Sequence, residues 1–488
     1  MNFFIKYKVG HKTYINESAF LKIKVESDYK VSIIPSKPIK IIEAKITYPY
    51  DKKGLLYCNG FQTWTDSGLY RYGEKMPHNK PLAYLMDFFI KTSTVGDVKW
   101  VRQDKLYSHT YTYIQKDSLY EFFGALNERT GFTTFHFKNE LEVYKDMEGT
   151  IIQNPFVVFD LFHMKGGLDA CLDKYFDLLN IPKTTAPLLD GYTSWYNHYQ
   201  NITEEKLLSD LEGMKKISWF HPKLFQLDDG YETFVGDWLD IDKKKFPNGL
   251  EKSVEKIKKA GMIPGIWIAP FICEKKSRIR KEHPEWILCR GALNWSTIYH
   301  LDITRKDVKD YLHKVFQYYI KLGFRFFKLD FLYSAAYEPL NGKTRSEIMY
   351  EAMDFVREEL KGCYILGCGV PLSSAFGKVD YCRIGCDVTL NDNGPWYFSL
   401  LHRERLSTIM AIKDTKARAH LNGRPFNNDP DVFILRDTPM TPKLKEELFN
   451  TNLRYGNLLL TSDDISKYSE DDLNKLRLIQ EKVEKNIK

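Results

Sequence analysis

The chain has 488 residues, of which 43% are hydrophobic and 28% charged, a balance that excludes gross disorder and is sufficient for a large core. Its formal net charge of +7 comes from 71 basic and 64 acidic residues that are interspersed, so the sequence lacks the basic patch typical of nucleic-acid binding. The longest apolar run, residues 262–273, is too short to cross a bilayer and contains two prolines and a glycine.

The start of the chain, Met1-Asn-Phe-Phe-Ile-Lys6, has no long apolar stretch and no small-residue cleavage site, so a secretory signal is not predicted. The 8 cysteines form no CxxC pair and several lie inside apolar runs, which favours reduced, mostly buried thiols. These features predict a cytoplasmic protein that has no membrane or nucleic-acid partner. They leave open whether it forms a homo-oligomer.

The first third of the chain alternates between polar and apolar residues. Residues 21–25 and 42–48 have this period of two, and residues 110–114 and 133–137 are rich in aromatic and β-branched side chains. The pattern predicts an antiparallel β domain with one face in water. A helix is expected near residues 168–179, followed by a proline-containing linker at 181–187.

After Pro187 the pattern changes to short apolar runs separated by helical segments, of which the clearest is expected over residues 307–322. Eight such units in about 280 residues favour an α/β fold of the (β/α)8 TIM barrel type over a doubly wound sheet. The expected strands are 191–196, 224–227, 262–268, 324–329, 364–366, 379–384, 432–435 and 457–460. Residues 465–488 are predicted to be helical, because Leu473, Leu476 and Ile479 are spaced for one face.

Acidic residues follow four of these expected strands. Because the C-terminal ends of the strands form the active-site face of a barrel, we expect several of the acids to meet in one pocket. A single Asp after a strand is often a turn residue or a helix N-cap, and we favour that role for the last pair. The acids are Asp228 with Asp229, Asp330, Asp387, and Asp463 with Asp464.

Asp330 and Asp387 suit a pair of carboxylates with different roles. Asp330 ends an apolar segment, and Lys328, two positions earlier on the same side of the strand, can keep it ionised as a nucleophile. Asp387 lies between Cys386 and Val388, whose apolar character can keep it protonated. Such a pair suits glycoside hydrolysis, in which one carboxylate attacks the anomeric carbon and the other donates and then accepts a proton.

Several motifs occur in an order that resembles a known family. They are Gln226-Leu-Asp-Asp-Gly-Tyr231, Gly236-Asp-Trp238, Phe246-Pro-Asn-Gly-Leu250, Gly261-Met-Ile-Pro-Gly-Ile-Trp267, Phe327-Lys-Leu-Asp330, Arg383-Ile-Gly-Cys-Asp387 and, in the β domain, Asn59-Gly-Phe-Gln-Thr-Trp64. This set resembles glycoside hydrolase family 36, the α-galactosidases, of the clan that includes families 27 and 31.

The resemblance implies an N-terminal antiparallel β-sandwich domain with a linker helix (1–185), a catalytic (β/α)8 barrel (186–464) and a C-terminal helical segment (465–488). It implies retaining hydrolysis of terminal α-galactosides through a covalent glycosyl-aspartate, with Asp330 as nucleophile and Asp387 as acid/base. The expected partner is a small oligosaccharide or glycoside. No cofactor or metal is expected. The implied substrate-binding residues are Asp228, Asp229, Trp267, Lys328, Cys368, Arg383, Trp195 and Trp64.

The resemblance also gives most of these residues individual roles. Asp228 and Asp229 would accept from the 4- and 6-hydroxyls of galactose, while Lys328 and Arg383 would donate to ring hydroxyls. Three further roles compete with plain packing: Trp267 as a wall against the sugar is weighed equally with a core role, Cys368 is favoured as a packed thiol, and Trp64 is favoured as a sandwich core residue rather than a cap on the pocket.

Departures from the family leave the substrate open. Ala269-Pro-Phe-Ile-Cys273 replaces a Glu-Pro-Glu-Met stretch, and residues 368–374 lack the usual glycine-rich run. Alternatives are therefore an α-N-acetylgalactosaminide, an α-glucoside or a transglycosidase. A Mg²⁺-dependent barrel enzyme using Asp229, Asp330 and Asp387, and a non-catalytic sugar-binding relative, are less favoured. With 24 residues after Asp464, the family's usual C-terminal β domain is expected to be absent.

Overall fold

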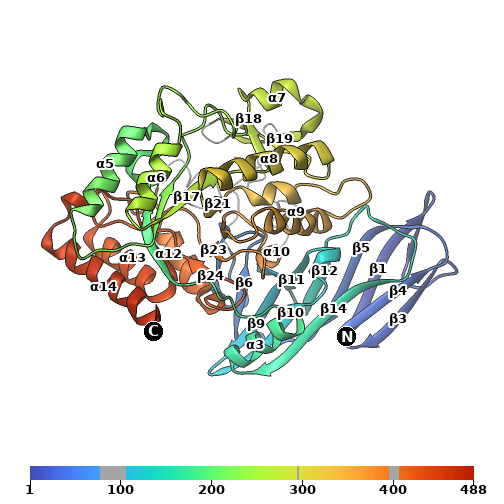
Figure 1. Ribbon diagram of the computed structural model, residues 1–488. Helices are drawn as coiled ribbons and strands as arrows, with labels where there is room; N and C mark the ends of the chain where they lie inside the picture. The colour runs from blue at the N-terminus through green and yellow to red at the C-terminus, as the bar shows by residue number, and fades with distance from the viewer. Residues whose placement is uncertain (77–105, 294–295, 395–405, 488) are drawn as a thin grey trace.

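The computed structural model describes residues 1–76, 106–293, 296–394 and 406–487, and it combines antiparallel sheets with one parallel sheet (Figure 1). The predicted α/β class is thereby confirmed. In this part of the chain, none of the helices has both the length and the apolar character that membrane crossing requires.

The N-terminal region consists of two antiparallel sheets that enclose a shared core. Ile5 and Ile46 from the first sheet and Ile33, Phe123 and Val158 from the second all lie in that core with less than 2% of their surface exposed. The alternation seen in the sequence therefore places every second side chain inside. The first sheet contains β1 (Asn2–Val9), β2 (Lys12–Ile15), β5 (Ile39–Tyr48), β8 (Tyr107–His109), β11 (Thr133–Phe137), β12 (Leu141–Lys145) and β13 (Ile151–Ile152). The second contains β3 (Leu21–Ser27), β4 (Lys30–Pro35), β6 (Leu55–Asn59), β7 (Ser67–Tyr70), β9 (Tyr111–Lys116), β10 (Leu119–Ala125) and β14 (Phe156–Gly166).

The parallel sheet follows the linker, and its strands alternate with helices. Its spatial order is β24-β23-β22-β21-β17-β16-β15-β26-β25, and every pairing within it is parallel. The strands are β15 (Leu189–Thr193), β16 (Leu224–Leu227), β17 (Ile263–Ile268), β21 (Phe326–Leu329), β22 (Tyr364–Gly367), β23 (Tyr381–Arg383), β24 (Asn427–Asp429), β25 (Val432–Phe433) and β26 (Leu458–Thr461).

The two outermost strands of this sheet, β24 and β25, follow one another in the sequence. Only Pro430 and Asp431 separate β24 from β25, and the backbone N–H of Asn457 donates to the carbonyl of Asn428 at 3.0 Å. The seventh expected strand, 432–435, is therefore incomplete as predicted, because the chain already pairs from Asn427 onward. Residues 427–429, which form β24, are polar yet buried, so no apolar run in the sequence marks this strand.

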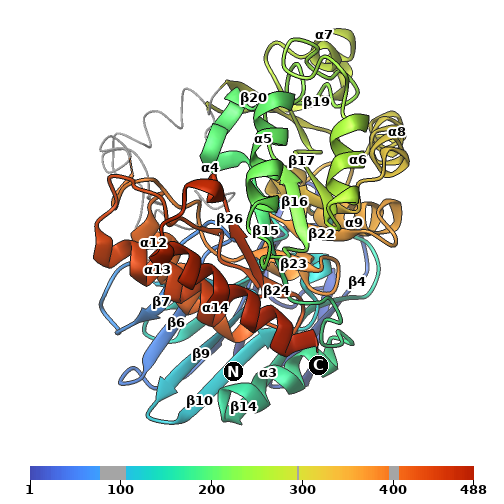
Figure 2. The same cartoon turned by 60° about the vertical axis from the view of Figure 1, so that its left-hand side comes forward.

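Helices cover the parallel sheet, as Figures 1 and 2 show. The helix expected at 307–322 is confirmed as α8 (Lys306–Leu322), which ends at Gly323 with a φ of 110°. The first expected strand ends early, because Trp195 and Tyr196 begin a short helix. The other helices are α3 (Leu168–Leu178), α4 (Trp195–His198), α5 (Glu204–Lys215), α6 (Glu251–Lys259), α7 (Arg278–Glu282), α9 (Arg345–Glu359), α10 (Leu372–Ala375), α12 (Thr408–Ala417), α13 (Pro442–Tyr455) and α14 (Glu470–Ile487).

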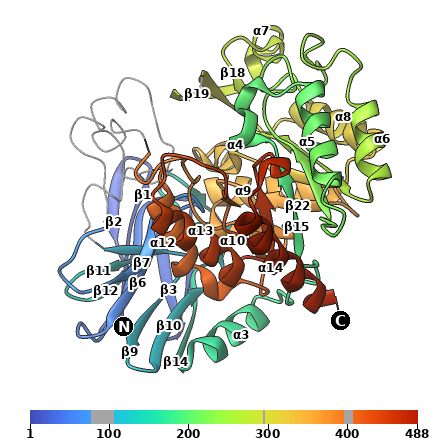
Figure 3. The ribbon, with the colours of Figure 1, turned by 90° about the vertical axis from the view of Figure 1, so that its left-hand side faces the viewer.

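Two further features bear on the site. A small antiparallel sheet of β18 (Ile272–Glu274), β19 (Ile287–Leu293) and β20 (Thr297–Leu301) is inserted between β17 and α8. On another side, α12 lies near β7 of the N-terminal region, with α13 beside it and α14 beyond (Figure 3). The predicted C-terminal helix is confirmed as α14, whose Leu476 and Ile479 are buried.

Candidate active site

The predicted site residues come together at one edge of the parallel sheet. Trp267 is in β17 and pairs with Lys328 of β21, while Asp330 directly follows β21. Asp228 follows β16 and Cys368 follows β22, both within the same strand neighbourhood. Because parallel strands point the same way, these residues all lie at the carboxyl ends of their strands.

Lys328 and Asp228 form a buried ion pair. The Lys328 ammonium donates to Asp228 Oδ2 at 2.8 Å, and the two side chains are 10% and 2% exposed. Gln226 Nε2 and Thr193 Oγ1 donate to the same oxygen at 2.7 and 3.1 Å. Burial lowers the pKa of Lys328, but Asp228, Cys368 and Asp330 together outweigh burial and raise that pKa. A fixed cation therefore lies beneath the site.

Asp330 is partly exposed and its two carboxylate oxygens have defined donors. Oδ2 accepts from the indole Nε1–H of Trp267 at 3.0 Å and Oδ1 from the backbone N–H of Phe331 at 2.8 Å. Burial raises the pKa of Asp330, against the opposing effects of Lys328, these two hydrogen bonds and Arg383. Lys328 thus favours the ionised form, as predicted, although its direct partner is Asp228 and burial has the larger effect.

Arg383 joins three carboxylates around Asp387. Its guanidinium donates to Asp387 Oδ1 at 2.9 Å and to Asp429 Oδ2 at 3.0 Å, and it pairs with Asp431 Oδ1 at 2.9 Å. The Asp387 side chain is 42% exposed, whereas those of Asp429 and Asp431 are buried. Burial raises the pKa of Asp387 to about 6, with Asp431 and Asp330 adding to the shift and Arg383 opposing it. Arg383 therefore holds these three carboxylates in place and is also a candidate sugar contact.

Asp229 has a second carboxyl group as its neighbour. Glu232 hydrogen-bonds its side chain, Gln200 Nε2 donates to Asp229 Oδ2 at 2.9 Å, and both carboxyl groups are buried. Burial raises the pKa of both acids. Sequence reasoning missed Glu232, although its position two residues after the Asp-Asp-Gly turn was visible in the sequence.

Trp64 reaches this edge from the N-terminal region, so the favoured interpretation of it as a sandwich core residue is wrong. Its indole packs edge-on against Phe331 with ring centroids 5.2 Å apart. Gly369 has a φ of 57°, and a Cβ added there would lie 3.0 Å from the same indole, so this close approach favours glycine. Trp64 therefore contacts the residues that follow Asp330 and Cys368.

The remaining aromatic and thiol candidates differ in their placement. Trp267 is 2% exposed and packs edge-on against the buried Trp238, so it is both a core residue and a donor to Asp330. Cys368 is 1% exposed and burial raises the pKa of its thiol, in agreement with a packed, protonated group. Trp195 lies in α4, packs edge-on against Tyr199 and lies against the apolar cluster that contains Cys368 and Cys386.

Asp463 and Asp464 have different roles. Asp464 accepts from the backbone N–H of Ser466 at the start of a 3₁₀ turn, which confirms the predicted turn role. Asp463 is fully buried and pairs with Arg436, so for it the turn role is wrong. Among the residues that the structure describes, no cluster of three or more His, Cys, Asp and Glu side chains is arranged to hold a metal ion.

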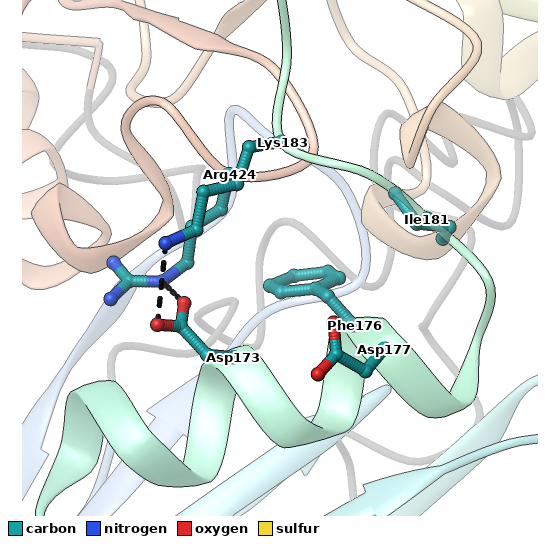
Figure 4. Close-up of a pocket in the computed structure, with 6 residues that line it drawn as sticks. All are labelled: Asp173, Phe176, Asp177, Ile181, Lys183 and Arg424. Carbon is teal, nitrogen blue, oxygen red and sulfur yellow. Dashed lines mark hydrogen bonds and ion pairs between the residues drawn. The ribbon is translucent and has the colours of Figure 1, made fainter.

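A separate pocket of about 220 Å³ lies away from this edge, and Figure 4 shows its lining. Asp173 and Phe176 come from α3, Lys183 from the linker and Arg424 from the segment before β24. Arg424 Nε donates to Asp173 at 2.9 Å and Lys183 pairs with Asp173 at 3.3 Å. The pocket is therefore at the amino end of the strands, opposite the carboxylates, and its charges are paired with one another.

Known proteins match part of this chain. Residues 182–355 match the family model described as Melibiase. The α-galactosidase Mel36A of Lactobacillus acidophilus is 26% identical over 215 residues, which are 41% of this chain and 28% of that protein. The α-galactosidase AgaA of Geobacillus stearothermophilus is 25% identical over 205 residues, which are 39% of this chain and 27% of that protein. The matched stretch thus spans less than a third of either relative.

Solved structures match over a greater length. TtGalA, an α-galactosidase from Thermus thermophilus in complex with p-nitrophenyl α-D-galactopyranoside, has a TM-score of 0.76 at 22% identity, covering 98% of this chain and 94% of that one. The family 36 α-galactosidase AgaA from Geobacillus stearothermophilus has a TM-score of 0.62 at 12% identity, covering 97% and 69%. The chain therefore has the fold of these enzymes. The relatives matched by sequence and by structure are all described as α-galactosidases, and AgaA is described as a family 36 enzyme.

Proposed function

We propose that the chain is a retaining glycoside hydrolase that cleaves terminal α-galactosides. The observation that carries the proposal is the pairing of two partly exposed carboxyl groups, Asp330 and Asp387, at one edge of the sheet in different surroundings. Burial raises the pKa of both groups, but two hydrogen bonds and Lys328 favour the ionised form of Asp330, whereas the neighbouring Asp431 adds to the shift that favours the proton on Asp387. Distinct protonation of two carboxyl groups is what a double displacement requires.

In the proposed reaction, Asp330 attacks the anomeric carbon while Asp387 protonates the departing glycosidic oxygen. The covalent β-galactosyl ester on Asp330 is then attacked by water, from which the Asp387 carboxylate removes a proton, so that galactose leaves with its α configuration. Asp429 and Asp431 are more deeply buried than the catalytic pair, and their proposed role is to hold Arg383 in place. A retaining mechanism predicts that the Asp330 and Asp387 carboxyl groups are about 5–5.5 Å apart in a galactose complex, and inversion would require more than about 6.5 Å.

The sugar-binding role of the surrounding groups follows from their hydrogen-bonding capacity. Asp228 and Asp229 are carboxylates that accept from ring hydroxyls, and the Lys328 ammonium and Arg383 guanidinium are donors. Because Lys328 and Asp228 already pair at 2.8 Å, a hydroxyl that meets both can donate to one and accept from the other. Two related structures support a galactosyl ligand: TtGalA is described in complex with p-nitrophenyl α-D-galactopyranoside and with stachyose.

We further infer the finer architecture. The parallel sheet, whose end strands β24 and β25 are consecutive, is interpreted as a closed (β/α)8 barrel, and the two antiparallel sheets as a β-sandwich. The domain limits 1–185, 186–464 and 465–488 remain predictions. Limited proteolysis followed by mass spectrometry of the fragments tests them.

A panel of p-nitrophenyl α-glycosides tests the substrate. The α-galactoside is expected to have the highest kcat/KM, and Asp330→Asn, which keeps the shape but cannot attack, serves as the inactive control. Faster turnover of the α-glucoside or the α-N-acetylgalactosaminide would replace the proposed substrate by one of these. Full activity after exhaustive treatment with a chelator separates the proposal from the Mg²⁺-dependent alternative.

A further inference from the structure

Asp229 and Glu232 form a carboxyl–carboxyl pair in the loop that follows β16. Their side chains hydrogen-bond one another, and the two residues are only 3% and 5% exposed. Two ionised carboxylates repel strongly at hydrogen-bond distance when they are shielded from water. A hydrogen bond between them requires one proton, so the pair holds one proton and one negative charge.

The loop is built to hold the pair in one geometry. The backbone N–H of Gly230 donates to Glu232 Oε2 at 3.3 Å, and Gly230 has a φ of 113°, a conformation that favours glycine. A Cβ at this position would lie 2.8 Å from the Cα of Gln200, so the two loops are in close contact. Gln200 Nε2 then donates to Asp229 Oδ2 at 2.9 Å. Lys245 ties the loops together by donating to the carbonyls of Gln200 and Gly230 at 2.8 and 2.9 Å.

The charged and titratable groups around the pair leave its proton in place. The carboxylate of Asp228 adds negative charge beside Asp229, and its own cation, Lys328, is already bound to it. The Lys245 ammonium acts on Asp229 in the opposite direction but donates to carbonyls. The hydroxyl-bearing neighbours Tyr231 and Tyr319 are themselves buried and protonated. Burial, followed by the proximity of Asp229, raises the pKa of Glu232 well above its usual range.

We propose that Glu232 is a positioning residue, which in its protonated form donates a hydrogen bond that fixes the Asp229 carboxylate for a substrate hydroxyl. This inference rests on the proposed function, in which Asp229 accepts from galactose. It adds that sugar binding depends on a proton outside the catalytic pair, whereas the chemical step does not. When alkaline conditions remove this proton, the two carboxylates repel, Asp229 shifts, and affinity for the sugar falls while the reacting groups are unchanged.

Galactose binding measured by calorimetry from pH 5 to pH 10 tests the proposal in the wild type and two variants. Glu232→Gln keeps a donor to Asp229 but cannot ionise. Its Kd at pH 6 is expected within about threefold of the wild-type value, and the alkaline rise in Kd is expected to disappear. Glu204→Gln is the matched control: Glu204 is also 5% exposed and bonds Asn248 on the same side of the barrel. It should keep the wild-type pH dependence.

The proposal is overturned if Glu232→Gln keeps the alkaline rise of the wild type, or if the wild type shows none. Infrared difference spectra between the wild type and Glu232→Gln give a second measurement that needs no activity. Because Asp414 is another buried acid whose pKa burial raises, only the neutral carboxyl band that Glu232→Gln loses at pH 8 belongs to the pair, and loss of no band would contradict the shared proton. If galactose fails to bind at every pH while this band is present, the proposed function is wrong, but the proton shared by Asp229 and Glu232 still stands. A Glu232→Gln protein that melts far below the wild type is replaced by Asp229→Asn, in which Glu232 donates to an amide oxygen instead of a carboxylate, so the band should change its frequency; an unchanged band would contradict the pair.

Discussion

Replacement of Arg418 by methionine is expected to be among the most destabilising single changes in this chain. The Arg418 side chain is fully buried, and its guanidinium connects the N-terminal region to the region of the parallel sheet. It contacts the segment that carries Trp64 and, on the other side, the carbonyl next to Arg383. The acceptors are Asn59 Oδ1 at 2.8 Å, and the carbonyl oxygens of Thr63 at 2.7 Å, Ile384 at 2.8 Å, Thr65 at 2.9 Å and Gln62 at 3.5 Å.

Methionine has a similar length but no donor, so Asn59 Oδ1 and the carbonyl oxygens of Thr63, Thr65 and Ile384 lose this donor in a buried region. A buried acceptor left without a donor costs about 1–3 kcal/mol. The Gln62 carbonyl keeps the Thr65 N–H and hydroxyl as donors. Taking the low end for each of the other four acceptors, Arg418→Met should lower the free energy of unfolding by about 4 kcal/mol. That amount approaches the low end of the whole stability of many domains, about 5–15 kcal/mol.

Urea unfolding followed by tryptophan fluorescence measures the change. Arg129→Met is the matched control. Arg129 also connects the N-terminal region to a helix that covers the parallel sheet, through Asp354 on α9, but its side chain is 52% exposed. An exposed pair contributes about 0–1 kcal/mol, so this variant should unfold close to the wild type. The reasoning is refuted if Arg418→Met is no less stable than Arg129→Met.

Three further predictions concern the catalytic pair. Trp267→Phe removes the indole donor from Asp330 and should lower kcat/KM for p-nitrophenyl α-galactoside about 10- to 100-fold. The acid limb of the pH profile of kcat/KM should move to higher pH, because the ionised form of Asp330 loses a hydrogen bond. An unchanged profile would contradict the role of that hydrogen bond. Because Asp387 must carry a proton to act as an acid and its pKa is about 6, kcat/KM for an unactivated galactoside should fall as pH rises through about 6, whereas a nitrophenyl galactoside should be less affected; equal profiles for the two would argue against this acid. Azide should restore turnover of the nitrophenyl galactoside by Asp387→Ala and give the α-galactosyl azide, and should give the β-azide with Asp330→Ala; NMR of the products distinguishes them, and opposite anomers would reverse the two roles.

Local periodicity was sufficient to predict the classes of element and the position of the main acids. Alternation along β5 and the apolar face of α8 reflect only the geometry of one strand or one helix, which the neighbouring residues determine. In the same way, an acid directly after an apolar strand, as at Asp330, lies at the carboxyl edge of any parallel sheet.

Tertiary structure alone decided what the polar and aromatic residues do between elements. Residues 427–429 are a buried strand made of Asn and Asp, which no apolar run marks, and their polar groups are satisfied by residues far away in the chain such as Arg383. Trp64 was indistinguishable from a core residue until the fold placed Gly369 beneath it. The proton between Asp229 and Glu232 depends on burial and on a loop contact with Gln200. Local sequence sets periodicity, but the burial and pairing of a charge depend on groups that only the folded chain brings together.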